Sequence, residues 1–182
     1  MSDSSSPRTA HTFELSTAEL LDIRGLLTRA FHGDFGDQDW DHSLGGVHAL
    51  VHEDGLLVAH GSVIQRRVIH AHRSLRVGYV EAVAVRADRR RRGLGGLVMD
   101  TLERVIDGAY EFGALSASDD GAELYRARGW QVWEGRIETL GPDGVVHLPD
   151  EEGSTYLRPA VNHPLPEPSG ALIFDWRDGD VL

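Results

Sequence analysis

A short segment rich in arginine and glycine has the residue types of an anion-binding loop. Five arginines and one aspartate lie within Arg86–Arg92, a local charge of 5 − 1 = +4, and Gly93 and Gly95 follow at once. A helix is predicted to begin beside these glycines, and the first N–H groups of a helix have no partner within it. Glycine lets the backbone approach a ligand, and arginine binds phosphate oxygens in pairs. The pattern predicts a pyrophosphate-binding loop, although a solvated arginine loop has the same composition.

Two common phosphate-binding motifs do not match this segment. A Walker loop would place Lys followed by Ser or Thr after its glycines, and a dinucleotide-binding loop would show Gly-x-Gly-x-x-Gly. The chain instead has Arg90-x-x-Gly93-x-Gly95. The segment is therefore neither of these two nucleotide-binding types.

Glu81 is the best candidate for a general base. It lies in the predicted strand Leu75–Val85, where strand alternation would place it on one face with Val77, Tyr79, Val83 and Val85. A carboxylate among such residues is unusual for simple burial, and burial would raise its pKa toward a useful range. The alternative is a structural carboxylate paired with Arg66 or Arg67.

Acidic residues gather on both sides of the arginine segment. Six acids and no arginine lie between Phe31 and Gly55, and nine acids against two arginines lie between Ile137 and the end. A basic centre with acidic flanks indicates one anionic and one cationic ligand, although any single carboxylate is more often simply solvated.

Composition excludes several classes of protein. The chain has 182 residues, no cysteine and a net charge of −11, and all 18 of its basic residues are arginine. The absence of cysteine excludes disulfides, thiol nucleophiles and cysteine metal sites, and fits a cytoplasmic location. The acidity argues against nucleic-acid binding, and no apolar run suggests a membrane span.

Two pairs of histidines have a spacing that permits metal binding: His48 with His52, and His70 with His72. No nearby acid completes a set of metal ligands, so we expect no metal.

The order of the predicted elements indicates an α+β domain with a mixed, mostly antiparallel sheet flanked by helices. We expect a disordered segment over residues 1–12 and a single domain over 13–182. Ser16 and Glu19 form a capping box for the first helix, and residues 32–46 read as a loop. A second helix is predicted over 94–109 and a short one over 121–128. Strands are predicted at 47–52, 56–70, 75–85, 114–118, 130–133, 136–140, 145–148, 155–158 and 171–174.

Two segments resemble the GNAT superfamily of N-acetyltransferases. Arg90-x-x-Gly93-x-Gly95, placed between a strand and a helix, is similar to that superfamily's acetyl-CoA motif. Ala122–Trp130, a helix bearing Tyr125 followed by Gly and an aromatic residue, is similar to its second motif. Both motifs occur in the expected order, so the resemblance implies a GNAT fold and acetyl-CoA as co-substrate.

Further blocks resemble one family within this superfamily, the mycobacterial aminoglycoside 2'-N-acetyltransferases. The resemblance covers essentially everything after Thr12. The blocks are Ala30–Phe35, Asp39-Trp40, Leu44–Leu50, Ile64–Arg67, Gly78–Asp88, Gly108–Tyr110, Gly113–Ser116 and Asp175–Val181. The resemblance implies direct acetyl transfer to the 2'-amine of an aminoglycoside, antibiotic resistance and a homodimer.

The resemblance also implies a role for individual residues. Glu81 would act as the base through water, and Tyr125 would protonate the departing thiolate. Backbone N–H groups around Val83 and Val85 would polarise the thioester carbonyl. The residues implied for acetyl-CoA are Val83, Ala84, Val85, Arg90, Arg91, Arg92, Gly93, Leu94 and Gly95.

Spaced carboxylates would bind the ammonium groups of an aminoglycoside. The residues implied are Asp34, Asp39, Glu81, Ala82, Ser116, Asp150, Glu151, Asp180 and the terminal Leu182. Which of Asp150, Glu151 and Glu152 faces the substrate stays open. The family members end in an aromatic residue, whereas this chain ends in Leu182, whose carboxylate would still bind an amine.

Two alternatives remain open at this point. The first is a GNAT enzyme for another cationic amine: a polyamine, a cell-wall amino sugar or a protein N-terminus. The second is a non-catalytic acyl-CoA-binding sensor domain, against which the presence of both Glu81 and Tyr125 argues.

Overall fold

The computed structural model describes residues 6–182, without the side chain of Asp120, and the chain divides into two compact units. Unit 1 contains the described part of Met1–Ile64 together with Val80–Val105, and unit 2 contains Gln65–Tyr79 with Ile106–Leu182. Three elements continue from one unit into the other: β3 (Leu56–His70), β4 (Arg73–Val85) and α3 (Leu94–Ala109). The single domain expected for residues 13–182 stays a prediction.

The strands of unit 1 form antiparallel pairs. β1 (Arg8–His11) pairs with β2 (Val47–Glu53), and β2 pairs with the first half of β3. The expectation of disorder over residues 1–12 is wrong for residues 8–11, because β2 supplies a distant hydrogen-bonding partner that the local sequence does not reveal. Residues 1–5 lie outside the described part of the chain.

The helix α1 (Thr17–Ala30) covers one face of these strands. Ser16 caps it by accepting from the Glu19 backbone N–H, while Glu19 returns a bond to the Ser16 backbone, so the predicted capping box is confirmed. Ile23 and Leu27 of α1 pack with Leu50 of β2 and with Ala84 of β4. These apolar contacts anchor the helix to the sheet.

A short helix lies where the sequence predicts a loop. The prediction of a loop over residues 32–46 is wrong for α2 (Asp37–His42), which lies within them. Asp39 accepts from the backbone N–H of Gly36 at 2.7 Å and so caps the helix. The six residues carry one large apolar side chain, Trp40, which is too little for a helical pattern to show.

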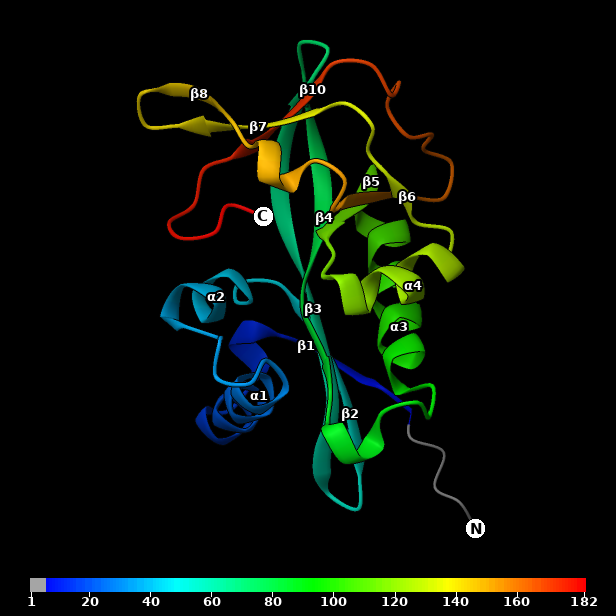
Figure 1. Ribbon diagram of the computed structural model, residues 1–182. Helices are drawn as coiled ribbons and strands as arrows, with labels where there is room; N and C mark the ends of the chain where they lie inside the picture. Colours follow the sequence, from blue (N-terminus) through cyan, green and yellow to red (C-terminus); the bar gives the residue numbers. More distant parts are fainter. Residues whose placement is uncertain (1–5) are drawn as a thin grey trace. The chain divides into compact units, whose positions relative to one another are not determined.

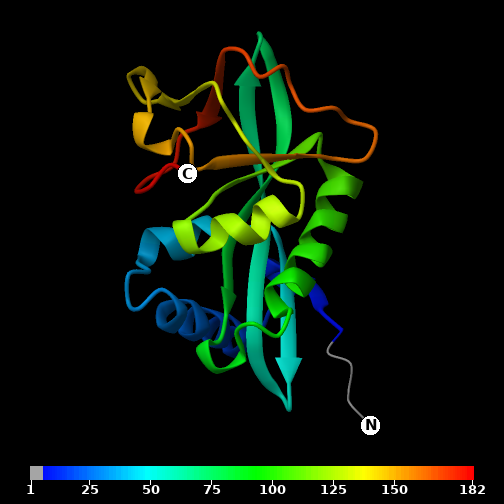
Figure 2. The same cartoon turned by 45° about the vertical axis from the view of Figure 1, so that its right-hand side comes forward.

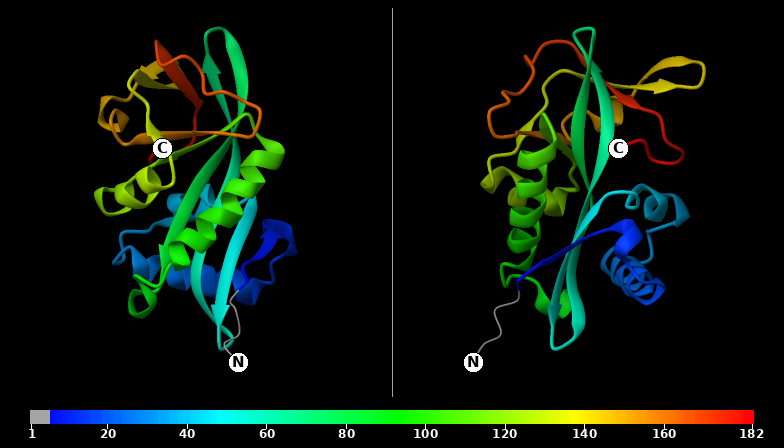
Figure 3. Two further views of the ribbon diagram at one scale, coloured as in Figure 1. Left: turned by 90° about the vertical axis from the view of Figure 1, so that its right-hand side faces the viewer. Right: turned by 180° about the vertical axis from the view of Figure 1, so that it is seen from behind.

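The opposite face of the unit 1 strands is covered by the first turns of α3 (Figure 3). A Cβ on Gly61 of β3 would meet Val98 and Leu102 of α3 at 2.8 and 3.0 Å, so the glycine permits this close approach. The sequence predicted α3 at the residues where it lies, Leu94–Ala109.

Unit 2 holds a mixed sheet that confirms the predicted architecture. The strands that follow α3 along the chain are β5 (Phe112–Ser116), β6 (Gln131–Val132), β7 (Arg136–Gly141), β8 (Gly144–His147), β9 (Thr155–Pro159) and β10 (Ala171–Asp175). The parallel pairs are β4 with β5 and β10 with β7. The antiparallel pairs are β5 with β9, β6 with β9, β3 with β10 and β7 with β8. The β7–β8 hairpin is visible in Figure 1.

The core of unit 2 is formed by strands from distant parts of the chain. Tyr79 of β4 and Phe174 of β10 contact each other edge to face, with ring centroids 5.9 Å apart. The segment between β9 and β10, coloured orange in Figure 2, brings the last strand back to this sheet. The short helix α4 (Asp119–Ala127) ends before Gly129, whose φ of 83° confirms it as the predicted C-terminal glycine.

None of the helices within residues 6–182 combines the length and the apolar character that crossing a membrane requires.

Candidate functional site

The segment Arg86–Gly95, called the arginine loop below, has a curled backbone in unit 1. A 3-10 turn at Ala87–Arg89 is followed by Arg90 in an extended conformation. Arg91 and Gly93 then have φ of 59° and 79°, and α3 begins at Leu94. Left-handed residues in a turn orient successive N–H groups into an anion-binding concavity, and the start of α3 adds its unpaired N–H groups. The loop therefore presents N–H donors and positive charge together.

The arginines of this loop divide into two groups. Arg89 and Arg92 share the Glu53 carboxylate, at 2.9 and 3.2 Å, and Arg86 contacts Asp88 at 2.8 Å. Arg90 and Arg91 are both exposed, and within residues 6–182 neither makes an ion pair. The first group fixes the loop, and the second group is available to an external anion.

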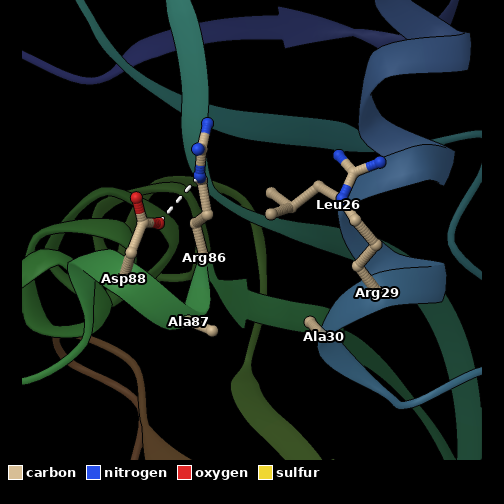
Figure 4. A pocket seen from close by; sticks show the side chains of 6 residues that line it. All are labelled: Leu26, Arg29, Ala30, Arg86, Ala87 and Asp88. Atoms are coloured by element: carbon tan, nitrogen blue, oxygen red, sulfur yellow. Dashed lines mark hydrogen bonds and ion pairs between the residues drawn. The ribbon is translucent and has the colours of Figure 1, made fainter.

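A pocket of about 380 Å³ in unit 1 borders the arginine loop (Figure 4). Its walls are Leu26, Arg29 and Ala30 of α1 and Arg86, Ala87 and Asp88 after β4. The carbonyl of Ala30 also lies 3.5 Å from a guanidinium nitrogen of Arg90. No sequence signal marks the α1 residues as part of this pocket, because only the fold brings the end of this helix to the loop.

The C-terminal part of β4 departs from regular strand geometry. Ala82 has a φ of 52°, a left-handed conformation that is uncommon for alanine. Val83 lies with Val98 and Leu102 of α3, whereas Ala84 packs in the cluster that contains α1. Gly78, an even-numbered residue, faces Ile106 of α3 and Tyr110, which directly follows that helix.

The expectation that Val77, Tyr79, Glu81 and Val83 share one face is therefore wrong. The left-handed residue at position 82 reverses the alternation of side chains along β4. Glu81 itself is partly buried immediately before this break, next to the partly buried Ala82, Val83 and Val85.

Arg66 is one of the two arginines proposed to pair with Glu81 if Glu81 were a structural carboxylate. The guanidinium of Arg66 binds other groups. Its nitrogens donate to the Asp175 carboxylate at 2.8 Å, to the Asp175 carbonyl at 2.6 Å and to the Val181 carbonyl at 2.6 Å. Arg67, the other proposed partner, is exposed.

Asp34 and Asp39 of unit 1 lie in different local settings. Asp34 is exposed in the turn after α1, and Asp39 is partly buried in α2. One carboxylate oxygen of Asp39 caps α2 through Gly36, which fixes the orientation of the side chain. Arg24 pairs with Asp37, so this acid already has a basic partner.

Unit 2 brings together four of the predicted site residues. Ser116 donates to the Glu151 carboxylate at 3.0 Å. Burial raises the pKa of Glu151, and the nearby negative charges of Asp180 and Asp150 raise it further, while the hydrogen bonds from Ser116 and Ser154 lower it. We call Asp150, Glu151 and Asp180 the acidic cluster.

The structure also separates the three neighbouring acids Asp150, Glu151 and Glu152. Glu151 faces Ser116, Asp150 is exposed, and Glu152 pairs with His147 at 2.7 Å. The hydrogen bond from His147 lowers the pKa of the exposed Glu152.

The C-terminal tail after β10 is held in place by arginines. The Val181 carbonyl accepts from buried Arg66 at 2.6 Å and from Arg177 at 2.8 Å. The Arg66 guanidinium also lies over the rings of Tyr79 and Phe174, at 5.0 and 5.2 Å from their centroids. These contacts fix Asp180 and Leu182 on either side of Val181, and Leu182 packs against the unit 2 core.

Tyr125 of α4 is 8% exposed in unit 2. Its ring lies 6.2 Å from the Trp130 ring and 6.5 Å from the Tyr156 ring, between centroids. An aromatic cluster of this kind rigidly positions the side chain.

The expected histidine pairs do not form. A register shift between Val51 and His52 leaves His52 exposed while His48 is fully buried. His70 is buried, but His72 lies exposed in a turn with a φ of 62°. Among the described residues, three or more potential metal ligands do not gather anywhere.

Comparison with known proteins identifies the relatives of this chain. A family model described as an acetyltransferase (GNAT) domain matches residues 13–133. An aminoglycoside 2'-N-acetyltransferase from Mycolicibacterium fortuitum is 44% identical over 177 residues, which cover 96% of this chain and 90% of that protein.

Solved structures are similar at the level of the fold. YhbS of Escherichia coli, a GNAT family N-acetyltransferase solved in complex with CoA, matches with a TM-score of 0.61 and 17% identity over 96% of this chain and 92% of its own. ElaA of Escherichia coli matches with a TM-score of 0.59 and 18% identity over 84% of this chain and 97% of its own. Eis1 from Mycobacterium abscessus matches with a TM-score of 0.58 and 19% identity; the match covers 69% of this chain but only 32% of that longer protein.

Proposed function

The chain belongs to the GNAT acetyltransferase family, and we propose that it transfers the acetyl group of acetyl-CoA directly to the 2'-amine of an aminoglycoside. The observation that carries this proposal is the 44% identity to an aminoglycoside 2'-N-acetyltransferase across nearly the whole of both chains. Acetylation removes one positive charge from the drug, and binding to RNA depends strongly on such charges. The consequence would be antibiotic resistance.

The arginine loop fits the pyrophosphate of acetyl-CoA. Arg91 and Gly93 are both left-handed, and a Cβ on Gly93 would meet nothing within 4 Å, so backbone conformation rather than space calls for glycine there. Arg90 and Arg91 are exposed and carry the charge that phosphates require. We assign acetyl-CoA binding to Arg90–Gly95 together with Val83, Ala84 and Val85, and we place part of its length in the adjoining pocket.

The reaction joins the amine nitrogen to the acetyl carbon and breaks the thioester C–S bond. One proton must leave the amine and one must reach the sulfur. Glu81 takes the first proton through water, and the Tyr125 hydroxyl supplies the second. Backbone N–H donors at Val83 and Val85 polarise the carbonyl without reorganisation.

The cationic substrate requires fixed negative groups. Glu151, held by Ser116, and Asp180, on the anchored tail, supply them in unit 2. Asp34, Asp39 and Glu81, with the backbone at Ala82, are the candidates in unit 1, and the carboxylate of Leu182 is a further candidate in unit 2. A cytoplasmic location and a homodimer also stay predictions.

Thiol release from acetyl-CoA with kanamycin B and with kanamycin A tests this function. The two drugs differ at the 2'-position, where kanamycin B has an amine and kanamycin A a hydroxyl. We expect turnover with kanamycin B alone. Turnover with both drugs would place the reaction at another amine, and turnover with neither, while acetyl-CoA still bound, would favour a different amine substrate or a non-catalytic sensor.

A further inference from the structure

Two histidines that the proposed reaction does not use form a buried chain in unit 1. His48 of β2 and His60 of β3 are both 0% exposed, and Nδ1 of His48 lies 2.9 Å from Nε2 of His60. At one end, His60 Nδ1 lies 3.0 Å from the carbonyl oxygen of Ala82. At the other end, His48 Nε2 lies 2.8 Å from the Thr12 hydroxyl, which accepts from the Gly45 N–H at 2.8 Å.

The Ala82 carbonyl at one end and the neutrality of both rings fix the direction of the hydrogen bonds in this chain. A carbonyl oxygen only accepts, so Nδ1 of His60 carries a proton. Burial lowers the pKa of His60 to about 3 and that of His48 to about 4, so both rings are neutral at pH 7. Nε2 of His60 therefore accepts from Nδ1–H of His48. Nε2 of His48 is left to accept from the Thr12 hydroxyl, which lies closer to it, at 2.8 Å, than to its other acceptor, the Gly46 carbonyl, at 3.3 Å. Each hydrogen bond in the chain is therefore donated in the same direction, from the Gly45 end toward the Ala82 end.

The acceptor at the end of the chain is the residue that interrupts β4. Ala82 is left-handed, with a φ of 52°, and follows Glu81 directly. Such a conformation persists only when the surrounding structure determines it. The bond from His60 supplies that constraint, because it draws the Ala82 carbonyl toward β3.

The same bond sets the orientation of the next N–H group. The described part of the chain contains no cis peptide bond, so the Ala82–Val83 peptide is trans and planar. The C=O and N–H of a trans peptide point in opposite directions. With the Ala82 carbonyl directed at His60, the Val83 N–H is directed away from it.

We propose that Thr12, His48 and His60 are positioning residues for acetyl transfer: their one-way hydrogen-bond chain locks the Ala82–Val83 peptide and so aims the Val83 N–H at the thioester carbonyl oxygen. The proposal rests on the proposed function only in naming the group that this N–H serves. A preorganised backbone donor acts in the transition state, so disturbing it lowers kcat and leaves acetyl-CoA binding largely unchanged.

The first test needs no ligand. Long-range 1H–15N spectra of histidine-labelled free protein report the tautomer of each ring, and the His48→Gln and His60→Asn variants assign the signals. At pH 7 we expect both rings to be neutral with the proton on Nδ1. A proton on Nε2 of either ring, or a charged ring, would overturn the chain.

The second test separates positioning from stability by substitution. The Asn side chain reproduces the Nδ1 donor of histidine, whereas Leu fills the space without a donor. We expect His60→Leu to lower kcat about 10- to 100-fold with the KM for acetyl-CoA within about twofold. His60→Asn should retain most of kcat. His70→Leu is the matched control, because His70 Nδ1 also lies 3.0 Å from a backbone carbonyl, that of Ala171.

Thr12→Val provides a second variant if His60→Leu fails to fold. It removes the hydroxyl at the far end of the chain, and we expect a smaller loss of kcat, about threefold to tenfold. A loss of activity that appears in KM, or an equal loss of kcat in His70→Leu and His60→Leu, would contradict the positioning role.

Difference infrared spectra of bound [1-13C]acetyl-CoA make the test independent of the amine substrate. We expect the thioester carbonyl stretch to fall on binding to the wild-type protein and to return toward its free value in His60→Leu. A stretch that is identical in both proteins would overturn the inference. If the stretch behaves as expected but kanamycin B is not turned over, the proposed substrate fails and the positioning chain stands.

Discussion

The arginine loop and the acidic cluster are built in opposite ways. The loop uses consecutive residues, a curled backbone and exposed side chains, with Arg91 and Gly93 in left-handed conformations. The acidic cluster joins Asp150 and Glu151 to Asp180, which lies on a tail held by buried Arg66. An anion can be bound by backbone N–H groups, so a local motif is sufficient for the loop. Ammonium groups are bound by carboxylate side chains, and these must be positioned by the tertiary structure.

Replacing the base should have the largest effect on turnover and should leave CoA binding at the arginine loop unchanged. We expect Glu81→Gln to lower kcat by about 10²- to 10⁴-fold, because an amide cannot accept the proton. Titration calorimetry should find CoA binding within about twofold of wild type, whereas kanamycin B binding weakens about two- to fivefold, because Glu81 also supplies one negative charge to the amine substrate. Glu138→Gln, another partly buried acid in a strand, is the control. Retention of more than a tenth of kcat would remove Glu81 from the mechanism.

A substitution in the loop should affect acetyl-CoA alone. Gly93→Ala forces a β-carbon onto a residue with a φ of 79°, and we expect the KM for acetyl-CoA to rise about tenfold as the loop backbone shifts. Gly55→Ala is matched, because Gly55 has a φ of 78° and equally open surroundings. An equal rise of this KM in both variants would contradict the assignment of acetyl-CoA binding to the arginine loop.

A substitution under the acidic cluster should affect the amine substrate alone. Arg66→Met removes two hydrogen bonds to Asp175 at the end of β10 and one to Val181 in the tail, at a cost of about 3 kcal/mol in stability. We expect faster hydrogen exchange over residues 175–182. The KM for kanamycin B should rise about fivefold while that for acetyl-CoA stays constant. The neighbouring exposed Arg67→Met is the control, and unchanged exchange in Arg66→Met would contradict the anchoring of the tail.

The smallest expected effect is a change in how stability depends on pH. The pKa values of His48 and His60 in the folded protein, about 4 and 3, lie below the ordinary 6.5. The unfolded chain therefore takes up protons that the folded protein does not, and stability falls as pH drops from 6.5 toward 4. Denaturant unfolding should show a slope smaller by about 1.4 kcal/mol per pH unit in His60→Leu. The slope should not change in exposed His52→Leu, and an unaltered slope in His60→Leu would argue against a neutral buried ring.

Local signals were sufficient to predict much of the fold. The capping box at Ser16 and Glu19 marked the start of α1, and the apolar period placed α3 at Leu94–Ala109. β1 and α2 were missed, because one depends on pairing with β2 and the other has only Trp40 as a large apolar side chain.

Only the part of the site that is formed by consecutive residues could be predicted from the sequence. The order of arginines and glycines in the loop can be read directly from the chain. The left-handed Ala82, the buried histidine chain and the role of Arg66 could not be read in this way. Each depends on contacts between distant segments, such as Arg66 with Val181 or Thr12 with His48. Among three adjacent acids, only the fold selects Glu151 for Ser116.

The central claim is that the two regions bind ligands of opposite charge independently. Calorimetric titration of CoA and of kanamycin B into Arg90→Ala/Arg91→Ala and into Glu151→Gln/Asp180→Asn tests it most directly. We predict that the loop variant raises the Kd for CoA about 30-fold or more and leaves that for kanamycin B within about twofold, because two charged phosphate contacts are lost. The acidic-cluster variant should do the reverse. Equal weakening of both ligands in either variant, or unchanged CoA binding in the loop variant, would contradict the account.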